Sequence, residues 1–180
     1  AVTAIERAQA RRAEILGLVQ ALTELCDPEE TGAHVNRVGA YSAEIYEAWA
    51  IQRHLPPDDI EKASDIIRMA AMLHDIGKLG VSNTILDKPD RLSADEWQQV
   101  RGYAHHSEQI LARIGPFREL ARVAGRHHER LDGKGYPVGC VADDIHLWAK
   151  LCSVVDVFEA LTASDRPYKK AKKLSDAVHI

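Results

Sequence analysis

Histidine and carboxylate side chains come together at four places along this 180-residue chain. One place holds a pair spaced four residues apart, two places hold adjacent residues, and one holds a single aspartate in an apolar segment. The residues are Glu30, His34, His74, Asp75, His127, His128 and Asp156. Imidazole nitrogens and carboxylate oxygens are ligands for iron, manganese and zinc, so the pattern predicts a metal centre.

Asp156 is the most unusual of these residues because its neighbours are apolar. Val155 and Val157 flank it, and a buried carboxylate is costly unless a cation or hydrogen bonds compensate it. A metal ion would provide that compensation. Two metal ions about 3.5–4 Å apart commonly serve to hydrolyse phosphate esters. Lys78, which follows Gly77, would add a positive charge for a phosphate oxygen.

Three helices are expected in the first half of the chain. Apolar residues at helical spacing over 15–25 predict one helix, which Asp27-Pro28 ends. Another is expected to begin near Thr31, and a third at Pro57, running toward Gly77. Residues 79–91 are expected to form an irregular loop. The stripe expected along one face of the second helix is His34, Val38, Tyr41, Ile45 and Trp49.

The second half of the chain is also helical in pattern. Residues 93–96, Ser-Ala-Asp-Glu, form a capping box that predicts a helix after it. A further helix is expected from about Phe117 to His127, and a long apolar helix over 145–163. Three glycines and a proline over 131–139 predict a loop. No alternating strand pattern competes, so the fold class is all-α, with about six or seven helices around the metal centre.

Composition excludes several classes of protein. The net charge of −4 argues against a binder of nucleic acid polymers. No apolar run approaches 18 residues and no signal peptide pattern is present, so no membrane span is expected in this segment. Cys26, Cys140 and Cys152 are widely scattered, which indicates neither a disulfide framework nor a thiolate zinc site. We therefore expect a cytoplasmic protein.

Four sequence blocks, in order, resemble the HD-GYP branch of the HD phosphohydrolase superfamily. Residues 74–78, His-Asp-Ile-Gly-Lys, resemble the superfamily signature, and residues 127–137 resemble the HHExxDGxGYP signature of the branch. Residues 156–168 and 30–34 resemble its later helix and its early metal-binding segment. The resemblance implies an HD-type all-α bundle and a metal-dependent phosphodiesterase that acts in bacterial second-messenger signalling. It would convert cyclic di-GMP to linear pGpG, and GMP as a further product is left open.

The resemblance also implies roles for individual residues. Asp75 would bridge two of the two or three divalent ions, most simply iron or manganese, and Lys78 would contact a phosphate oxygen. The implied metal ligands are Glu30, His34, His74, Asp75, His127, His128 and Asp156. Gly135, Tyr136 and Pro137 would form the lip of the substrate pocket, and Arg166 and Lys169 would contact guanine or phosphate.

The resemblance also suggests how the chain is organised. Residues 28–180 would form the HD-GYP domain, truncated at its C-terminal end. The helix within residues 1–27 would be a connector from an upstream sensory or receiver domain, or equally a part of the domain. We read the chain as a piece of a longer protein, and a homodimer is left open.

One position departs from the family pattern. The family usually places a further metal-ligating histidine where this chain has Tyr103. His106, one helical turn later, would be a substitute ligand, or Tyr103 would supply a phenolate oxygen. Two other functions therefore stay open: a catalytically weak module that binds the dinucleotide or a protein, and a hydrolase of another cyclic dinucleotide.

Overall fold

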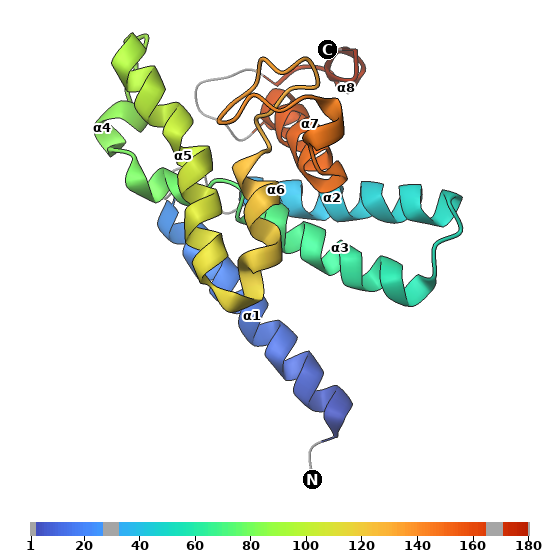
Figure 1. The fold of residues 1–180 in the computed structure, drawn as a ribbon. Coiled ribbons are helices and arrows are strands. Elements are labelled where there is room, and N and C mark those ends of the chain that lie inside the picture. Colours follow the sequence, from blue (N-terminus) through green and yellow to red (C-terminus); the bar gives the residue numbers. More distant parts are fainter. Residues whose placement is uncertain (1–2, 27–32, 165–170, 180) are drawn as a thin grey trace.

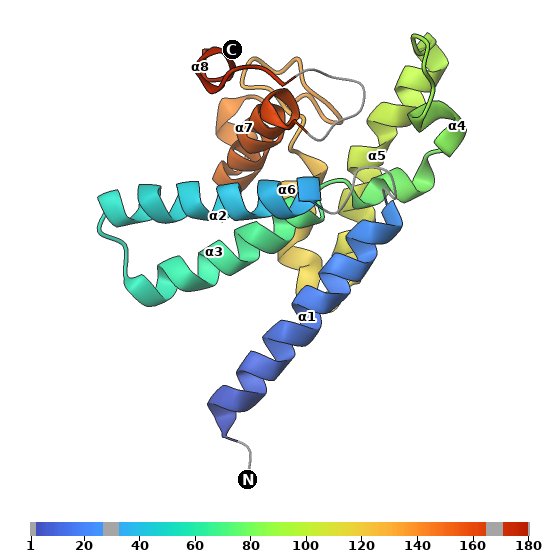
Figure 2. The ribbon, with the colours of Figure 1, turned by 180° about the vertical axis from the view of Figure 1, so that it is seen from behind.

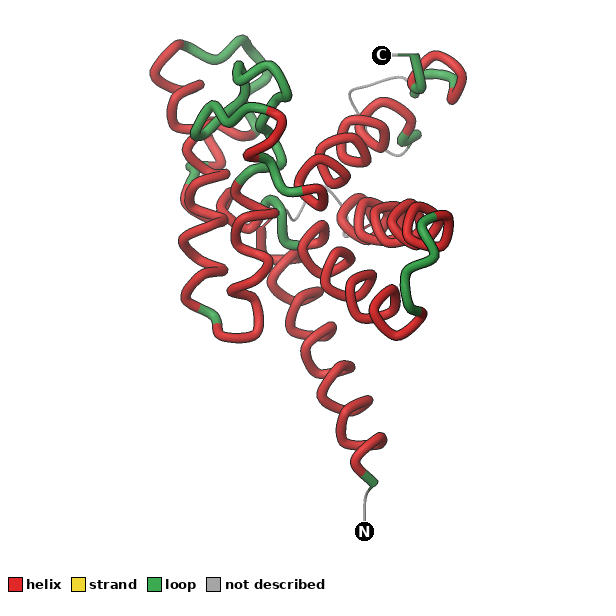
Figure 3. The backbone as a smooth tube through the Cα atoms, turned by 45° about the vertical axis from the view of Figure 1, so that its right-hand side comes forward, coloured by secondary structure: helices red, strands yellow, loops and turns green. Residues whose placement is uncertain are grey.

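The computed structural model describes residues 3–26, 33–164 and 171–179. Within them the chain is all-α, as expected, and Figure 3 shows helices and loops but no strand. The α-helices are α1 (Ala4–Cys26), α2 (Ala33–Gln52), α3 (Pro57–Met72), α4 (Asn83–Leu86), α5 (Ala94–Arg113), α6 (Ala121–Gly125), α7 (Leu147–Thr162) and α8 (Leu174–Ala177). The described residues thus hold more than the six or seven helices expected, because α4 and α8 are single turns of four residues.

Helices α2 and α3 form an antiparallel hairpin (Figures 1 and 2). Pro57 begins α3, as predicted. The stripe expected on α2 was only partly right, because Tyr41 and Ile45 are exposed. The buried face includes Gly39 instead, where a Cβ would lie 2.8 Å from a side-chain carbon of Met72. Apolar spacing alone missed this face because small residues let α3 approach closely.

Helix α1 joins the core through its C-terminal half. Val19 is fully buried in the main core, and Ile15 and Leu22 pack against it. The N-terminal half projects away from the other helices in both Figures 1 and 2. The helix predicted over residues 15–25 is confirmed. The connector role and the boundary at residue 28 stay predictions.

Helix α5 starts where the capping box predicted. Ser93 accepts a hydrogen bond from the Glu96 backbone N–H, and the Glu96 side chain accepts one from the Ser93 N–H. The segment before it is more ordered than the loop expected over 79–91. It contains the end of the 3₁₀ turn η1 (Ile76–Gly80) and the whole of α4. The apolar pattern missed α4 because a single turn contains no full helical repeat.

Turn η1 packs directly on α5. A Cβ on Gly77 would collide with the Tyr103 carbonyl oxygen and lie 2.5 Å from the Ser107 backbone nitrogen. Ser107 Oγ accepts from the Gly77 N–H and donates to the His74 carbonyl, both at 2.9 Å. This packing fixes the backbone that carries His74 and Asp75.

Helices α6 and α7 complete the core. The 3₁₀ turn η2 (Gly115–Leu120) leads into α6, in the segment expected to be helical up to His127. Helix α7 confirms the long apolar helix expected over 145–163. Its buried residues Ala149, Cys152 and Val155 belong to the main core. Among the described helices, none is both long enough and apolar enough to cross a membrane.

Candidate metal centre

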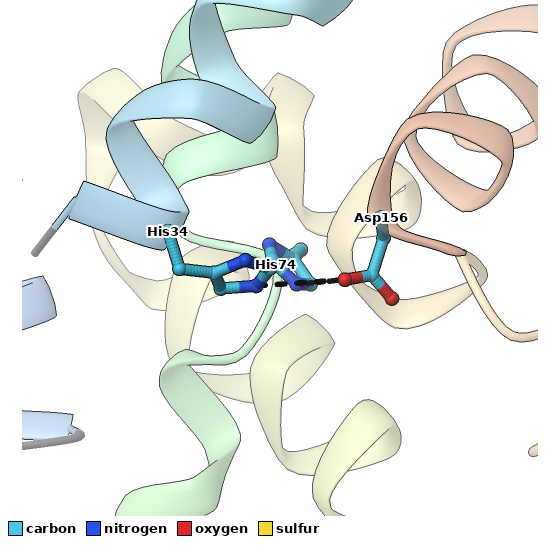
Figure 4. Close-up of side chains that lie close together, drawn as sticks. All are labelled: His34, His74 and Asp156. Atoms are coloured by element: carbon cyan, nitrogen blue, oxygen red, sulfur yellow. Dashed lines mark ion pairs between the residues drawn. The ribbon is translucent and has the colours of Figure 1, made fainter. Parts of the chain in front are cut away.

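Three side chains from distant parts of the sequence meet at the centre of the bundle. His34 lies at the start of α2, His74 just after α3, and Asp156 within α7. Figure 4 shows His34 and Asp156 pointing toward His74. Asp156 Oδ1 lies 3.5 Å from His34 Nε2 and 3.7 Å from His74 Nε2. These three residues could hold one metal ion.

A second group shares His74 with the first. Asp75 Oδ2 lies 3.4 Å from His74 Nε2, and Asp75 Oδ1 lies 3.6 Å from His127 Nε2. His127 follows the end of α6 and is fully buried. The two oxygens of Asp75 therefore face two different histidines, as a bridging carboxylate requires. His74, Asp75 and His127 could also hold an ion.

Hydrogen bonds at the far side of each ring fix the orientation of these histidines. Nδ1 of His74 donates to the Ala71 carbonyl, and Nδ1 of His127 donates to the Ala124 carbonyl, each at 2.5 Å. A carbonyl oxygen only accepts, so the Nδ1 of each ring carries a proton. Each Nε2 then presents a lone pair to the centre, as metal-binding histidines do.

Two buried atoms in this cluster have no hydrogen-bond partner among the described residues. They are His74 Nε2 and Asp75 Oδ1. Buried polar atoms in folded proteins are nearly always paired, so an unpaired nitrogen lone pair and a carboxylate oxygen need an explanation. Ligands of one tetrahedral ion at about 2.1 Å lie about 3.4 Å apart, close to the separations of 3.4 to 3.7 Å in the cluster. The residues present therefore fit a metal ion.

The protonation states also suit a cation. Burial lowers the pKa of His74 more than Asp75 and Asp156 raise it, so the ring is neutral. Burial raises the pKa of Asp75, but His74, Lys78 and His127 together hold it well below the usual value. The cluster thus offers a neutral imidazole at His74 and an ionised carboxylate at Asp75.

Lys78 reaches the same carboxylate. Its Nζ lies 2.8 Å from Asp75 Oδ2, and the side chain is largely buried. The ammonium group also lies 5.8 Å from the centre of the Tyr103 ring. Lys78, which the sequence predicted as a phosphate contact, therefore places a cation at the edge of the cluster.

Tyr103 enters the cluster at the position of the family histidine. Its hydroxyl lies 3.2 Å from His127 Nε2 and makes a close hydrogen bond with His128 Nε2. Burial, followed by the charge of Asp75, raises the pKa of Tyr103 well above its ordinary value. The group is therefore a neutral phenol in these surroundings, and phenolate coordination is not favoured by them.

His128 differs from the other histidines of the cluster. Burial and the neighbouring His127 lower its pKa to about 3, so the ring is neutral. Its Nε2 is engaged by Tyr103. His128 was predicted as a metal ligand, but it does not belong to either three-residue group.

His106, the predicted substitute ligand, lies apart from the cluster. His106 is exposed, and its ring lies against Gly80. It does not join either three-residue group, because it faces η1 from the surface of α5. Glu30, Arg166 and Lys169 fall outside the described residues, so their roles stay predictions.

The predicted pocket lip lies beside His128. The Tyr136 ring is 4.6 Å from the His128 ring, centre to centre, and Pro137 follows through a cis peptide bond. A Cβ on Gly135 would lie 2.5 Å from Glu129 Cα, so only glycine allows this close approach. Burial and Asp75 raise the pKa of Tyr136 to about 12, which leaves a neutral hydroxyl.

Two buried carboxylates were missed as positioning residues. Glu129 accepts hydrogen bonds from the backbone N–H groups of Val138, Gly139 and Cys140, and so holds the loop after Pro137. Glu159 pairs with His34 Nδ1 and with the Arg37 guanidinium. The sequence signal that could have identified them is an acidic residue within an apolar segment, for Glu159, or beside a glycine-rich segment, for Glu129.

The sequence of this chain is similar to HD domains and to several phosphodiesterases. Residues 34–180 match a family model described as an HD domain. A 3'3'-cGAMP-specific phosphodiesterase of Vibrio cholerae is 43% identical over 91% of this chain and 34% of its own length. A cyclic di-GMP phosphodiesterase of Pseudomonas aeruginosa is 39% identical over 73% of this chain and 31% of its own length. A cyclic di-GMP phosphodiesterase of Thermotoga maritima is 36% identical over 91% of this chain and 42% of its own length. The chain thus spans between a quarter and under half of the curated relatives it matches.

Proposed function

The chain belongs to the HD domain family, in its HD-GYP branch, and we propose that it is a metal-dependent phosphodiesterase that opens the ring of cyclic di-GMP. The observation that supports this function best is the pair of unsatisfied buried atoms, His74 Nε2 and Asp75 Oδ1, between two groups of ligand side chains. The product would be linear pGpG, with GMP as a further product.

We assign the ligands to two ions. An imidazole nitrogen has one lone pair, so His74 would serve one ion, together with His34 and Asp156. His127 would serve a second ion, and Asp75 would contribute to both sites. Bound divalent ions, with iron or manganese as our preference, supply a Lewis acid for the phosphate and lower the pKa of a water molecule.

The remaining residues of the site act on the substrate. Lys78, held against Asp75 at 2.8 Å, neutralises a phosphate oxygen as charge develops. The loop with Gly135, Tyr136 and Pro137 forms the lip of the substrate pocket in this proposal. Glu129 stabilises the loop by accepting hydrogen bonds from three backbone N–H groups. Arg166 and Lys169 contribute further phosphate or guanine contacts in this proposal.

The cellular setting is part of the proposal. Cys140 and Cys152 are free and buried, which is typical of a reducing compartment such as the cytoplasm. An upstream sensory or receiver domain would control the enzyme, and two copies would associate.

A second function has one observation in its favour. Tyr103 engages both His127 and His128, which would weaken the second ion site. A protein with one weak site would bind cyclic di-GMP, or a partner protein, with little turnover. Hydrolysis of 3'3'-cGAMP is the third candidate, supported by the Vibrio relative of 43% identity.

The deciding experiment measures metal content and turnover on one sample. The chain is purified without oxygen, loaded with Mn²⁺ or Fe²⁺, and given cyclic di-GMP or 3'3'-cGAMP. We expect linear product and at least two ions per chain, both lost in Asp75→Asn and both kept in the exposed control His105→Ala. A loaded protein that binds cyclic di-GMP without forming product would establish the binding module instead.

A further inference from the structure

A series of neighbouring flat groups links the metal cluster to exposed residues of α5. The rings of His127 and His128 lie 4.0 Å apart, and those of His128 and Tyr136 lie 4.6 Å apart, centre to centre. The Arg101 guanidinium follows at 5.7 Å from the Tyr136 ring centre. It lies 5.8 Å from the Trp97 ring centre as well. The series therefore joins the cluster to an exposed arginine and tryptophan.

Arg101 and Trp97 share one face of α5. They are four residues apart in a helix, so their side chains are neighbours. Trp97 is 47% exposed and Arg101 is also exposed. In the described part of the chain, no carboxylate forms an ion pair with Arg101. Its guanidinium N–H groups are therefore available to a ligand.

The chemistry of these two side chains suits a guanine base. An arginine can donate two parallel hydrogen bonds to O6 and N7 of guanine, whereas adenine presents an amino donor beside N7. Tryptophan and tyrosine rings stack on bases, and this stacking favours binding of any base. An arginine close to two aromatic rings therefore combines base selection with stacking.

We propose that Arg101 and Trp97, together with Tyr136, form a guanine-binding subsite beside the metal centre. The proposal rests on the proposed function, because it assumes that a phosphate of the dinucleotide lies at the cluster. Tyr136 lies close to both His128 and Arg101, at 4.6 Å from the His128 ring centre and 5.7 Å from the Arg101 guanidinium carbon. A base that extends outward from that phosphate would pass Tyr136 and meet Arg101. Cyclic di-GMP and 3'3'-cGAMP both carry a guanine, so the subsite serves either.

The test compares a substrate that has a base with one that has none. The metal-loaded wild type, Arg101→Ala, Arg101→Lys and Trp97→Ala are assayed on cyclic di-GMP and on bis(4-nitrophenyl) phosphate. Arg113→Ala is the matched control, because Arg113 is an exposed arginine on the same helix. We expect Arg101→Ala to lower kcat/KM for cyclic di-GMP roughly tenfold, mainly through KM, and to leave the base-free substrate unchanged. Arg101→Lys should restore only part of the loss, since a lysine keeps the charge but lacks the planar fork that directs two parallel hydrogen bonds.

Other outcomes would overturn the subsite. Equal losses on both substrates would make Arg101 a structural residue, and no loss on cyclic di-GMP would remove it from recognition. A wild type that hydrolyses neither compound would contradict the proposed function alone. The subsite is then measured by titrating the protein with GMP and with AMP: tighter binding of GMP that disappears in Arg101→Ala supports it, and equal binding of both nucleotides refutes it.

Discussion

Tyr103 determines which hydrogen bonds the Nε2 atoms of His127 and His128 make. A hydroxyl has one proton, so Tyr103 can donate to only one of the two Nε2 atoms that it touches. His127 Nε2 must accept, because its Nδ1 already donates to Ala124. As long as the phenol occupies this place, His128 is directed toward Tyr103 rather than toward the groups formed with His74.

Replacing Tyr103 by histidine should therefore strengthen metal binding. The variant Tyr103→His places a nitrogen ligand where the family usually has one and removes the hydroxyl from His128. We expect a higher metal-to-protein ratio after loading with Mn²⁺, measured by elemental analysis. Tyr103→Phe is the control, because it frees His128 without adding a ligand. An unchanged ratio in Tyr103→His would mean that the phenol does not limit the second site.

Glu159 should control the metal through His34. Ligating histidines commonly donate their other N–H to a carboxylate, and loss of such a partner costs about 10- to 100-fold in metal affinity. The buried Glu159 pairs with His34 Nδ1 and with Arg37. We expect Glu159→Gln to weaken Mn²⁺ binding by roughly 10- to 100-fold in titration calorimetry. The exposed Glu44→Gln on α2 should bind as the wild type does, and equal affinities in both variants would deny Glu159 this role.

At the scale of elements, the contact between η1 and α5 supports the cluster. Gly77→Ala would force a Cβ into the Tyr103 carbonyl and the Ser107 backbone. Overpacking of this kind costs about 1–3 kcal/mol, and here the neighbours are backbone atoms that cannot rotate away. We expect a loss of about 3 kcal/mol in the free energy of unfolding, measured with urea. Gly17→Ala in α1, where a Cβ has open space, should stabilise the protein by about 0.5–1 kcal/mol instead. An unchanged free energy of unfolding in Gly77→Ala would show that η1 and α5 can move apart at little cost.

The elements that sequence alone could predict are those with strong local signals. The capping box at Ser93 and the proline at Pro57 act within one turn, so the starts of α5 and α3 followed from them. The buried face of α2 did not follow, because Gly39 is buried by its approach to Met72, a contact between helices. The one-turn α4 was missed for a related reason, since it is too short for periodicity to register.

The same distinction applies to the site. The sequence predicted His74, Asp75 and His127 as ligands because histidine beside a carboxylate or a second histidine is visible there, and the structure brings the three together. The roles of Tyr103 and Glu159 were not predicted, because each depends on a partner more than 20 residues away. His106 was an attractive substitute by helical spacing, yet it lies against Gly80 on the surface. Spacing predicts which residues share a helix face, but not which neighbouring element that face meets.

At the scale of the whole molecule, the proposed ions would tie together four segments: α2, the turn after α3, the end of α6, and α7. Because an ion bound only by the folded chain stabilises it by mass action, Mn²⁺ at about 100 times its Kd should add about 2.7 kcal/mol. For a chain of this size that corresponds to a rise of about 5–10 °C in Tm, reversed by EDTA. His74→Ala should abolish the rise, whereas the exposed His105→Ala should keep it. An equal rise in wild type and His74→Ala, measured by calorimetry, would place the bound ion elsewhere on the molecule.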